Sequence, residues 1–343
     1  MAKVLLLSTA DKCDDGSDYN RGAFLKLQQS ASIDIFHDHQ LTDDPESADL
    51  ILFAELYGAG DYFDSVKQHP LVKKFREKCF LFCSNDFVIP LLPGIYASIE
   101  RRWSSARTRS GFYLGVFENE FVEFAPPTND LKYLYSFIGN CDTAPIRRKL
   151  GRLVHPRSLY VDTSAEYPDF LYNKLTADQK RAYSFRYTEI CKASKFILCP
   201  RGFGASSVRL FDAMRMGRVP VILSDQWVPP AGPKWEKFSL RLPEREFTSV
   251  PELLERHEPS FIEMAKLARA QWEEWFSEGV CFHRVVEWCL DIKTHRHIPE
   301  RVARFSVYIQ FLRPFHFRHF LRTKYRAWQK KRRADKYEVS ATT

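Results

Sequence analysis

The segment from Lys195 to Trp227 constrains the fold of this chain more than any other, because it contains a complete strand, loop, helix and strand. An apolar run ends at Cys199, and turn residues follow as far as Gly204. The next residues have apolar side chains at helical spacing, and Gly217 stands where a helix ends in the left-handed conformation. The apolar run Val219–Leu223 predicts a second, parallel strand. Such a unit places a helix N-terminus beside a flexible loop at one edge of a sheet, where a diphosphate can bind.

The same segment carries a second, more specific pattern. Its members are Cys199-Pro200-Arg201-Gly202, Ser206-Ser207, Arg209 with Asp212, Gly217, Pro220-Val221-Ile222 and Ser224-Asp225. In this pattern the chain resembles the exostosin family of glycosyltransferases, as a soluble member of bacterial type. A looser likeness covers 135–140 with Arg147 and extends forward to the region of Leu253. Two positions depart from the family: Asp212 stands where the longer Glu is usual, and Arg218 stands where Cys is usual.

Composition places the chain among globular proteins. Its 343 residues are 45% hydrophobic, which is enough for two core-forming domains. No apolar run approaches the ~20 residues of a membrane-spanning helix, and Met1-Ala2-Lys3 leads into the apolar run Val4–Leu7 rather than into a signal sequence. The eight cysteines lack paired metal-ligand spacing, which predicts reduced, buried thiols. We therefore expect a cytoplasmic protein.

Apolar runs and helical patterns alternate along the chain and divide it into two similar units. Short strands separated by helices pair in parallel through right-handed crossovers. In the first unit we expect helices near 23–29 and 62–78, and strands at 4–8, 33–36, 48–54 and 79–83. In the second we expect helices at 146–153, 179–192 and from 206, and strands at 133–138, 159–162, 195–199 and 219–223. The Pro-rich segment 125–130 is the predicted linker, and long helices over 260–292 should pack on the second unit.

This organisation predicts an α/β protein with two Rossmann-like doubly wound domains that face a cleft, followed by a basic C-terminal helical tail. The predicted domains are 1–128 and 129–298, and the tail is 299–343. The exostosin resemblance implies the same architecture, called GT-B, in which the acceptor binds the first domain and the nucleotide sugar binds the second. The cleft between the domains would then be the active site.

Several residues of the second unit are candidates for holding a nucleotide sugar. When the nucleotide departs, negative charge grows on its diphosphate, and arginines and the amides of a helix N-terminus can stabilise that charge. Arg147, Arg201 and Arg209 are predicted to bind phosphate, and Asp212 to accept hydrogen bonds from ribose. The other predicted members of the site are Gly202, Ser206 and Ser207. Either serine could instead cap the helix, Arg209 and Asp212 could form a surface ion pair, and Arg147 could belong to a solvated basic turn.

A catalytic base is expected at the carboxyl end of a strand in the first domain, because inverting transfer needs a carboxylate near the acceptor hydroxyl. Glu55 and Asp86 each follow such a strand, and Asp14 and Asp15 in the first loop are third choices. Carboxylates in such loops also serve as caps and turn residues. That alternative stays open for each of them.

We expect neither a metal nor a cofactor beyond the donor substrate itself. The sequence contains no Asp-x-Asp, the motif with which other glycosyltransferases bind a divalent cation. The histidine pairs His295/His297 and His316/His319 lie among basic and aromatic residues, without a carboxylate or thiolate beside them to complete a metal site.

Positive charge is concentrated in the tail. Residues 301–336 contain twelve Lys or Arg and one Asp, a net +11, so that the rest of the chain, whose total is +8, carries −3. Aromatic residues are interleaved with these charges. Such a segment suits an anionic membrane surface, and nucleic-acid binding uses the same ingredients. We expect peripheral membrane contact through 301–336, at the cytoplasmic face, and no nucleic acid.

Together with the resemblance, these features predict an inverting, metal-independent glycosyltransferase for polysaccharide or other glycoconjugate synthesis. Its expected substrates are a nucleotide diphosphate sugar, UDP-linked, and a glycan or lipid-linked acceptor. The nearest alternative is a fucosyltransferase-like enzyme that uses GDP-fucose, although that family normally lacks the Cys-Pro-Arg-Gly loop. A second alternative is a nucleic-acid-binding protein that acts through its basic tail.

Overall fold

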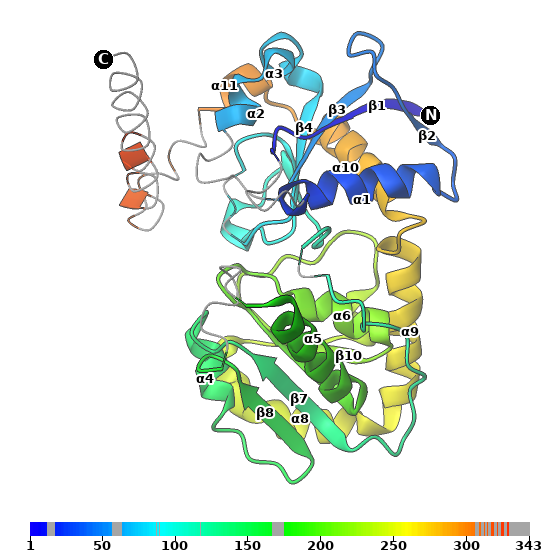
Figure 1. Cartoon of the computed structure of the whole chain (residues 1–343), viewed down its shortest axis with the longest axis vertical. Helices are drawn as coiled ribbons and strands as arrows, with labels where there is room; N and C mark the ends of the chain where they lie inside the picture. Colours follow the sequence, from blue (N-terminus) through cyan, green and yellow to red (C-terminus); the bar gives the residue numbers. More distant parts are fainter. Residues whose placement is uncertain are drawn as a thin grey trace.

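The computed structural model describes residues 1–11, 18–56, 64–86, 88, 90–116, 118–166, 175–305 and scattered positions between 309 and 328. Two α/β domains lie one above the other, each built on its own parallel sheet (Figure 1). Among the described residues, no helix combines the length and apolar character needed to cross a membrane. The predicted α/β fold with two Rossmann-like domains in the GT-B arrangement is confirmed.

The first sheet is assembled from the N-terminal third of the chain. Its six parallel strands run in the order β2-β1-β3-β4-β5-β6. They are β1 (Ala2–Leu7), β2 (His39–Leu41), β3 (Leu50–Glu55), β4 (Cys79–Cys83), β5 (Gly94–Tyr96) and β6 (Thr108–Ser110). The associated helices are α1 (Gly22–Ser32), α2 (Asp64–Gln68) and α3 (Pro70–Lys74). Every residue of β3 and β4 is buried, as expected for central strands that are covered on both faces.

The second sheet repeats the winding of the first. Its five parallel strands run in the order β11-β10-β9-β7-β8. They are β7 (Tyr133–Gly139), β8 (Ser158–Asp162), β9 (Ser194–Pro200), β10 (Val219–Leu223) and β11 (Leu240–Leu242). The helices are α4 (Pro145–Leu150), α5 (Ala177–Lys192), α6 (Val208–Met216), α7 (Trp235–Phe238), α8 (Val250–His257) and α9 (Phe261–Trp275). The strand order reverses between β7 and β9, and ligands of open α/β sheets bind at the carboxyl ends of such strands.

Most predicted elements are present, and each wrong prediction has an identifiable physical cause. The strand expected at 33–36 does not form: α1 ends there, and the amide of Ile35 donates to the carbonyl of Gly279 instead. The helix expected at 62–78 is interrupted at Pro70, where His69 Nδ1 accepts from the Leu71 amide and starts a new helix. Strands β5 and β6 have only three residues each, too few to show a periodic pattern.

The long helices expected over 260–292 are two, and they serve different domains. Helix α9 packs on α6, α7 and β10 of the second domain. Helix α10 (Cys281–His295) instead packs against α1, β5 and β6 of the first domain, so the chain crosses back (Figure 1). The prediction that this whole region packs on the second domain is therefore wrong for α10.

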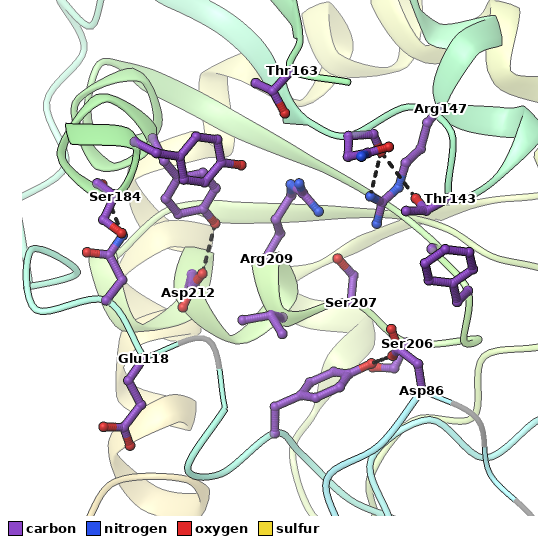
Figure 2. Close-up of a pocket in the computed structure, with 18 residues that line it drawn as sticks. Asp86, Glu118, Thr143, Arg147, Thr163, Ser184, Ser206, Ser207, Arg209 and Asp212 are labelled. Atoms are coloured by element: carbon purple, nitrogen blue, oxygen red, sulfur yellow. Dashed lines mark hydrogen bonds between the residues drawn. The ribbon is translucent and has the colours of Figure 1, made fainter. Parts of the chain in front are cut away.

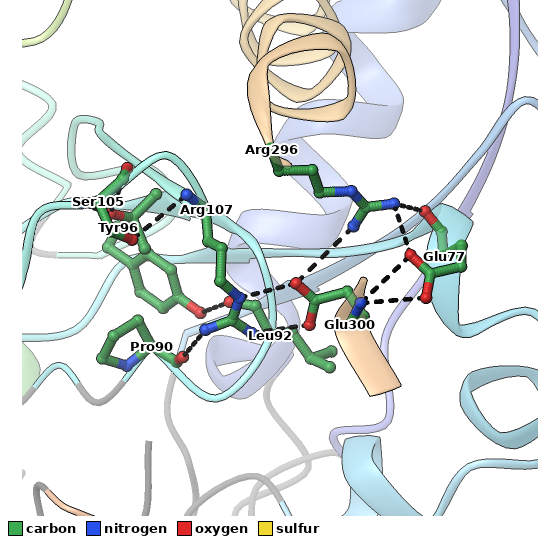
Figure 3. Close-up of polar contacts among 9 residues, drawn as sticks. Glu77, Pro90, Leu92, Tyr96, Ser105, Arg107, Arg296 and Glu300 are labelled. Carbon is green, nitrogen blue, oxygen red and sulfur yellow. Dashed lines mark hydrogen bonds and ion pairs between the residues drawn. The ribbon is translucent and has the colours of Figure 1, made fainter. Parts of the chain in front are cut away.

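A buried ion pair fastens the returning chain to the first domain (Figure 3). Helix α11 (Glu300–Ala303) begins with Glu300, whose two carboxylate oxygens accept hydrogen bonds of 2.7 Å from Nε and Nη2 of Arg107. The amide of Glu300 donates to Glu77, which also pairs with Arg296 at 3.3 Å. The Glu300 side chain is only 1% exposed. A buried carboxylate is unfavourable unless it is paired, and the bidentate ion pair with Arg107 offsets the cost of its burial.

Arg218, one of the two residues that depart from the family pattern, joins several segments of the second domain. Its guanidinium donates to the carbonyls of Lys192 at 2.7 Å, Ala125 at 2.7 Å and Gly217 at 2.9 Å. These acceptors lie at the end of α5, in the linker and at the end of α6, where helix carbonyls lack intrahelical partners. Burial of this cation among carbonyls lowers the pKa of Arg218 to about 10.

We predict that Arg218→Met lowers the free energy of unfolding by about 2 to 4 kcal/mol, because two or more buried carbonyls lose their donor. Chemical denaturation with tryptophan fluorescence measures the change. Arg245→Met is the matched control, since the Arg245 side chain is 84% exposed and should change stability by less than about 0.5 kcal/mol. Equal effects of the two substitutions would contradict the structural role of Arg218.

Candidate active site

A cavity of about 180 Å³ lies between the two domains. It opens at the carboxyl ends of β7 and β9, where the strand order of the second sheet reverses, and the first domain closes it with Asp86 and Tyr113. Of the residues predicted for the site, the structure brings seven to this cavity: Asp86, Arg147, Gly202, Ser206, Ser207, Arg209 and Asp212.

Two arginines project into the cavity (Figure 2). Backbone carbonyls hold both of them. Arg147, on α4, donates from Nε to the carbonyl of Arg201 at 2.9 Å and from Nη1 to that of Asn140 at 3.0 Å. Arg209, in the first turn of α6, donates from Nε to the carbonyl of Ile138 at 2.9 Å. These bonds fix both guanidinium groups at the ends of β7 and β9.

The two arginine charges are close together, and the carboxylates that act on them electrostatically, Asp86 on Arg147 and Asp212 on Arg209, are each hydrogen-bonded to a tyrosine and not to an arginine. Within the described part of the chain, neither guanidinium forms an ion pair with a carboxylate. Both lie against the ring of Phe137, Arg147 at 5.9 Å and Arg209 at 5.0 Å from its centroid. Burial, and next the nearby charge of Arg209, lower the pKa of Arg147 to about 9. An anion in the cavity would relieve this repulsion and replace the lost hydration.

Two glycines make room for the guanidinium groups. A Cβ atom at Gly139 would lie 1.8 Å from Nη2 of Arg209, and one at Gly202 would lie 2.8 Å from Nη2 of Arg147. Any side chain at either position would displace an arginine. Gly202, the glycine of the Cys-Pro-Arg-Gly loop, therefore leaves space for the Arg147 side chain in addition to allowing the turn.

The N-terminus of α6 faces the same cavity and keeps its hydroxyl groups available. Ser206 and Ser207 are buried, and neither Oγ has a hydrogen-bond partner. Ser207 occupies the N-cap position of α6, but its hydroxyl does not bond a helix amide, so the capping role considered for these serines is not observed. Unpartnered hydroxyls and the positive end of a helix dipole are both suited to an anionic ligand.

Asp212 lies one turn further along α6 and is bound to a tyrosine. It accepts a 2.8 Å hydrogen bond from the Tyr187 hydroxyl, and no hydrogen bond joins it to Arg209. The surface ion pair considered as an alternative is therefore not formed. Burial raises the pKa of Asp212 to about 6, against the lowering effect of Tyr187 and Arg209.

The first domain contributes Asp86, which follows β4, to the opposite wall of the cavity. Its Oδ1 accepts a 2.5 Å hydrogen bond from the Tyr113 hydroxyl, and burial raises the pKa of Asp86. The domains are in close contact here: the amide of Ser206 donates to Oγ of Ser98 at 2.9 Å, and a Cβ at Gly204 would lie 2.8 Å from Oδ1 of Asp86.

Two predicted site residues lie outside the cavity lining. Glu55 is 2% exposed, and its carboxylate accepts hydrogen bonds from Ser8 and from the amide and hydroxyl of Thr9. Arg201 points to Glu244, with Nε 2.8 Å from Oε1. The structure thus gives both side chains intradomain partners instead of bringing them to the cavity. Asp14 and Asp15 lie outside the described residues.

The aromatic part of the lining was missed at the level of sequence. Tyr183 and Tyr187 stand four residues apart on α5 and face the cavity with ring centroids 6.5 Å apart, and Tyr113 comes from a loop of the first domain. The four-residue spacing on α5 was a usable signal. The position of Tyr113 depends on how the domains meet, for which the sequence holds no local pattern.

Known proteins resemble this chain around the cavity. Residues 120–257 match the family described as the Exostosin GT47 domain. The chain is 32% identical over 136 residues to the Exostosin-1 homolog of Caenorhabditis elegans, covering 37% of this chain and 36% of that protein. It is 27% identical over 201 residues to Exostosin-1 of Drosophila melanogaster, covering 55% and 26%. The chain therefore spans only about a quarter to just over a third of these relatives. The exostosin resemblance is confirmed over the matched residues.

Solved structures resemble the chain across both domains. Sucrose-phosphate synthase from Thermosynechococcus elongatus aligns with 86% of this chain and 99% of its own, with 10% identity and a TM-score of 0.44. A glycosyltransferase of lipopolysaccharide biosynthesis, WaaG, aligns with 86% of this chain and all of its own, with 12% identity and a TM-score of 0.37.

We predict that Arg209→Met weakens the binding of inorganic pyrophosphate by roughly 10- to 150-fold, the loss typical of a hydrogen bond to a charged group. Isothermal titration calorimetry at fixed ionic strength measures the change. Arg201→Met is the matched control, because Arg201 is a nearby arginine that pairs with Glu244 outside the cavity, and it should bind pyrophosphate as the wild type does. Loss of affinity in the Arg201 variant alone would contradict the assignment.

Proposed function

We propose, from the premise that residues 120–257 form an exostosin GT47 domain, that this protein is a glycosyltransferase that moves a sugar from a nucleotide diphosphate sugar to a glycan or glycolipid. The observation that carries the proposal is the pair of arginines, Arg147 and Arg209, that meet at the β7/β9 switch point without a carboxylate partner. A diphosphate can accept hydrogen bonds from both guanidinium groups, and it would lie at the N-terminus of α6.

The proposed mechanism uses protein cations to stabilise the leaving group. As the bond to the anomeric carbon breaks, negative charge grows on the diphosphate, and Arg147, Arg209 and the hydroxyls of Ser206 and Ser207 surround the cavity where it would collect. Fixed donors of this kind need no reorganisation during the reaction. Together with the lack of an Asp-x-Asp in the sequence, they favour metal-independent transfer.

The donor that we propose is a UDP-sugar, with Asp212 as the acceptor for ribose hydroxyls. A carboxylate with its pKa near 6 is largely ionised at neutral pH, and only one of its oxygens is used by Tyr187. GDP-fucose remains the alternative donor, because both nucleotides present the same diphosphate and ribose groups. The nucleobase contacts that would distinguish them are not assigned.

A second cavity, of about 320 Å³, suits the acceptor. It adjoins the first and shares Tyr113, Glu118 and Asp212 with it. Its apolar lining is aromatic and includes Phe112, Phe211, Trp272 and Phe276. Aromatic faces pack against the apolar faces of sugar rings, and carboxylates at the junction can bind hydroxyls.

Asp86, whose pKa is raised by burial, is our proposed base for an inverting transfer.

The tail is proposed as a peripheral membrane contact. Apolar side chains at the described positions are exposed at helical spacing, among them Val302, Phe305, Ile309 and Leu312. Basic residues occur throughout the same segment. A membrane surface satisfies both features, since anionic headgroups attract the charges and the acyl boundary accepts the apolar groups. The nucleic-acid alternative accounts for the charges but leaves the cavity without a role.

We predict that UDP, or failing that GDP, raises the melting temperature of the full-length protein and does so equally in EDTA. The melting temperature rises because the nucleotide binds only the folded state, in which the two arginines lie close together. Differential scanning fluorimetry across nucleotide diphosphates measures it, with the nucleosides as controls for the phosphate contribution. Stabilisation that disappears on chelation would contradict metal-independent binding, and no response to any nucleotide would contradict the proposed function.

We predict that replacing Lys330, Lys331, Arg332 and Arg333 by Gln reduces retention on anionic lipid vesicles by up to roughly a thousandfold, at ~1 kcal/mol for each basic residue. Vesicle co-sedimentation measures the change, with neutral phosphatidylcholine vesicles as the control. Nucleotide binding should be unaffected. If the substituted protein sedimented as the wild type does, the tail charges would not be the membrane contact.

A further inference from the structure

A cluster of two histidines and a glutamate joins β2 to α10, on the first domain and outside the cavity. His39 is the first residue of β2, and His283 and Glu287 stand four residues apart on one face of α10. One potential ligand atom from each side chain lies within 4.8 Å of the other two. The two elements are far apart in the sequence and meet only because α10 crosses back from the second domain.

His283 is available as a ligand. It is 6% exposed, and its Nδ1 is buried without a hydrogen-bond partner. A buried ring nitrogen without a partner is unfavourable, and a bound cation would satisfy it.

His39 and Glu287 already face each other. Nε2 of His39 lies 2.8 Å from Oε1 of Glu287, and Nδ1 accepts from the amide of Ala2 at 3.3 Å. If Nε2 coordinated the metal, the proton of the neutral imidazole would have to be on Nδ1. Nδ1 could then no longer accept the 3.3 Å hydrogen bond from the Ala2 amide, which would be lost. The Glu287 side chain is 49% exposed, so it can rotate to become the third protein ligand. The fourth coordination position of the metal would then be open to water.

The surrounding charge also favours a cation. Asp34 is 3% exposed, its Oδ1 has no hydrogen-bond partner, and its carboxylate acts electrostatically on His283. With Glu287, it places two carboxyl groups beside the two histidines. The nearby cation, Arg284, is stacked over the rings of Phe36 and Trp275 at 4.8 and 4.1 Å.

We propose that His39, His283 and Glu287 bind a zinc ion that fastens β2 to α10. Two imidazoles and one carboxylate form a ligand set that zinc accepts in a tetrahedral site, with water in the fourth position. Zinc–ligand bonds of about 2.0 to 2.1 Å place the ligand atoms roughly 3.3 Å apart. The rings of His39 and His283 are stacked, with centroids 4.9 Å apart, so closing the cluster requires these side chains to rotate toward a common point. Magnesium prefers octahedral oxygen ligands and does not suit two imidazoles.

Such a site would lie outside the cavity and would be independent of the glycosyltransferase proposal. The backbone around it already joins the same segments, since the amide of Ile35 donates to Gly279 and that of Phe282 to Oγ of Ser30. A metal at the cluster would add a link between the start of the chain and the helix that returns to it.

The test is zinc titration of the full-length, metal-stripped protein, read by calorimetry and by melting temperature. We expect one zinc ion per chain to bind tightly and raise the melting temperature, and magnesium to have no effect. Glu287→Gln, at an exposed position that should not disturb folding, and His283→Gln should each weaken zinc binding at least about tenfold. Cobalt in place of zinc should give the visible absorption of a tetrahedral site.

The matched control is His155→Gln. His155 and Glu255 form another histidine–glutamate contact, at 3.1 Å, without a third ligand among the described residues, so this variant should bind zinc as the wild type does. Zinc binding that is equal in the wild type and in both cluster variants would overturn the proposal, as would no zinc binding by the wild type.

Discussion

The arrangement of the site depends on one electrostatic constraint, the close approach of two arginine side chains that form no ion pair with a carboxylate among the described residues. Arg147 and Arg209 come from α4 and α6, and each is anchored by carbonyls at the end of a central strand. Their repulsion would separate them if the backbone did not hold them, and Gly139 and Gly202 leave the space in which they fit. Hydrogen bonds to backbone carbonyls hold the two guanidinium groups in place. Because these donors are already positioned in the folded protein, the site is suited to binding anions.

The crossing of α10 is the second constraint, because it binds the two domains into one unit. The helix leaves the second domain after α9 and packs against the first sheet, and Glu300 then pairs with the buried Arg107. The two walls of the cavity are therefore connected both by the linker near Ala125 and by this return. Asp86 and Tyr113 reach the arginine pair because the domains are held together in this way.

Sequence patterns predicted the second domain better than the first. Strands β9 and β10 and the left-handed Gly217, with φ of 70°, were readable because buried parallel strands and helix ends have local signatures. The strand expected near Ile35 failed because that segment contacts the returning chain at Gly279, a partner distant in the sequence. Packing across distant segments leaves no periodic pattern.

The candidate site shows the same division. Arg147, Arg209 and Asp212 were predicted from a motif and its spacing, and all three reach the cavity. Arg201 belongs to the same motif, yet its side chain pairs with Glu244, because a loop position does not determine the direction of a side chain. Glu55 and Asp86 were indistinguishable in sequence, since each follows a strand. Only the contacts of Thr9 with Glu55 and of Tyr113 with Asp86 separate them.

The central claim is that Arg147 and Arg209 together hold the diphosphate of the donor. An experimental structure of the full-length protein with a bound nucleotide diphosphate tests this most directly, through the distances from the phosphate oxygens to the two guanidinium groups. We predict phosphate oxygens within hydrogen-bonding distance of both arginines, beside Ser206 and Ser207 at the start of α6. A diphosphate bound away from both arginines, for example at Arg201 and outside the cavity, would contradict the account.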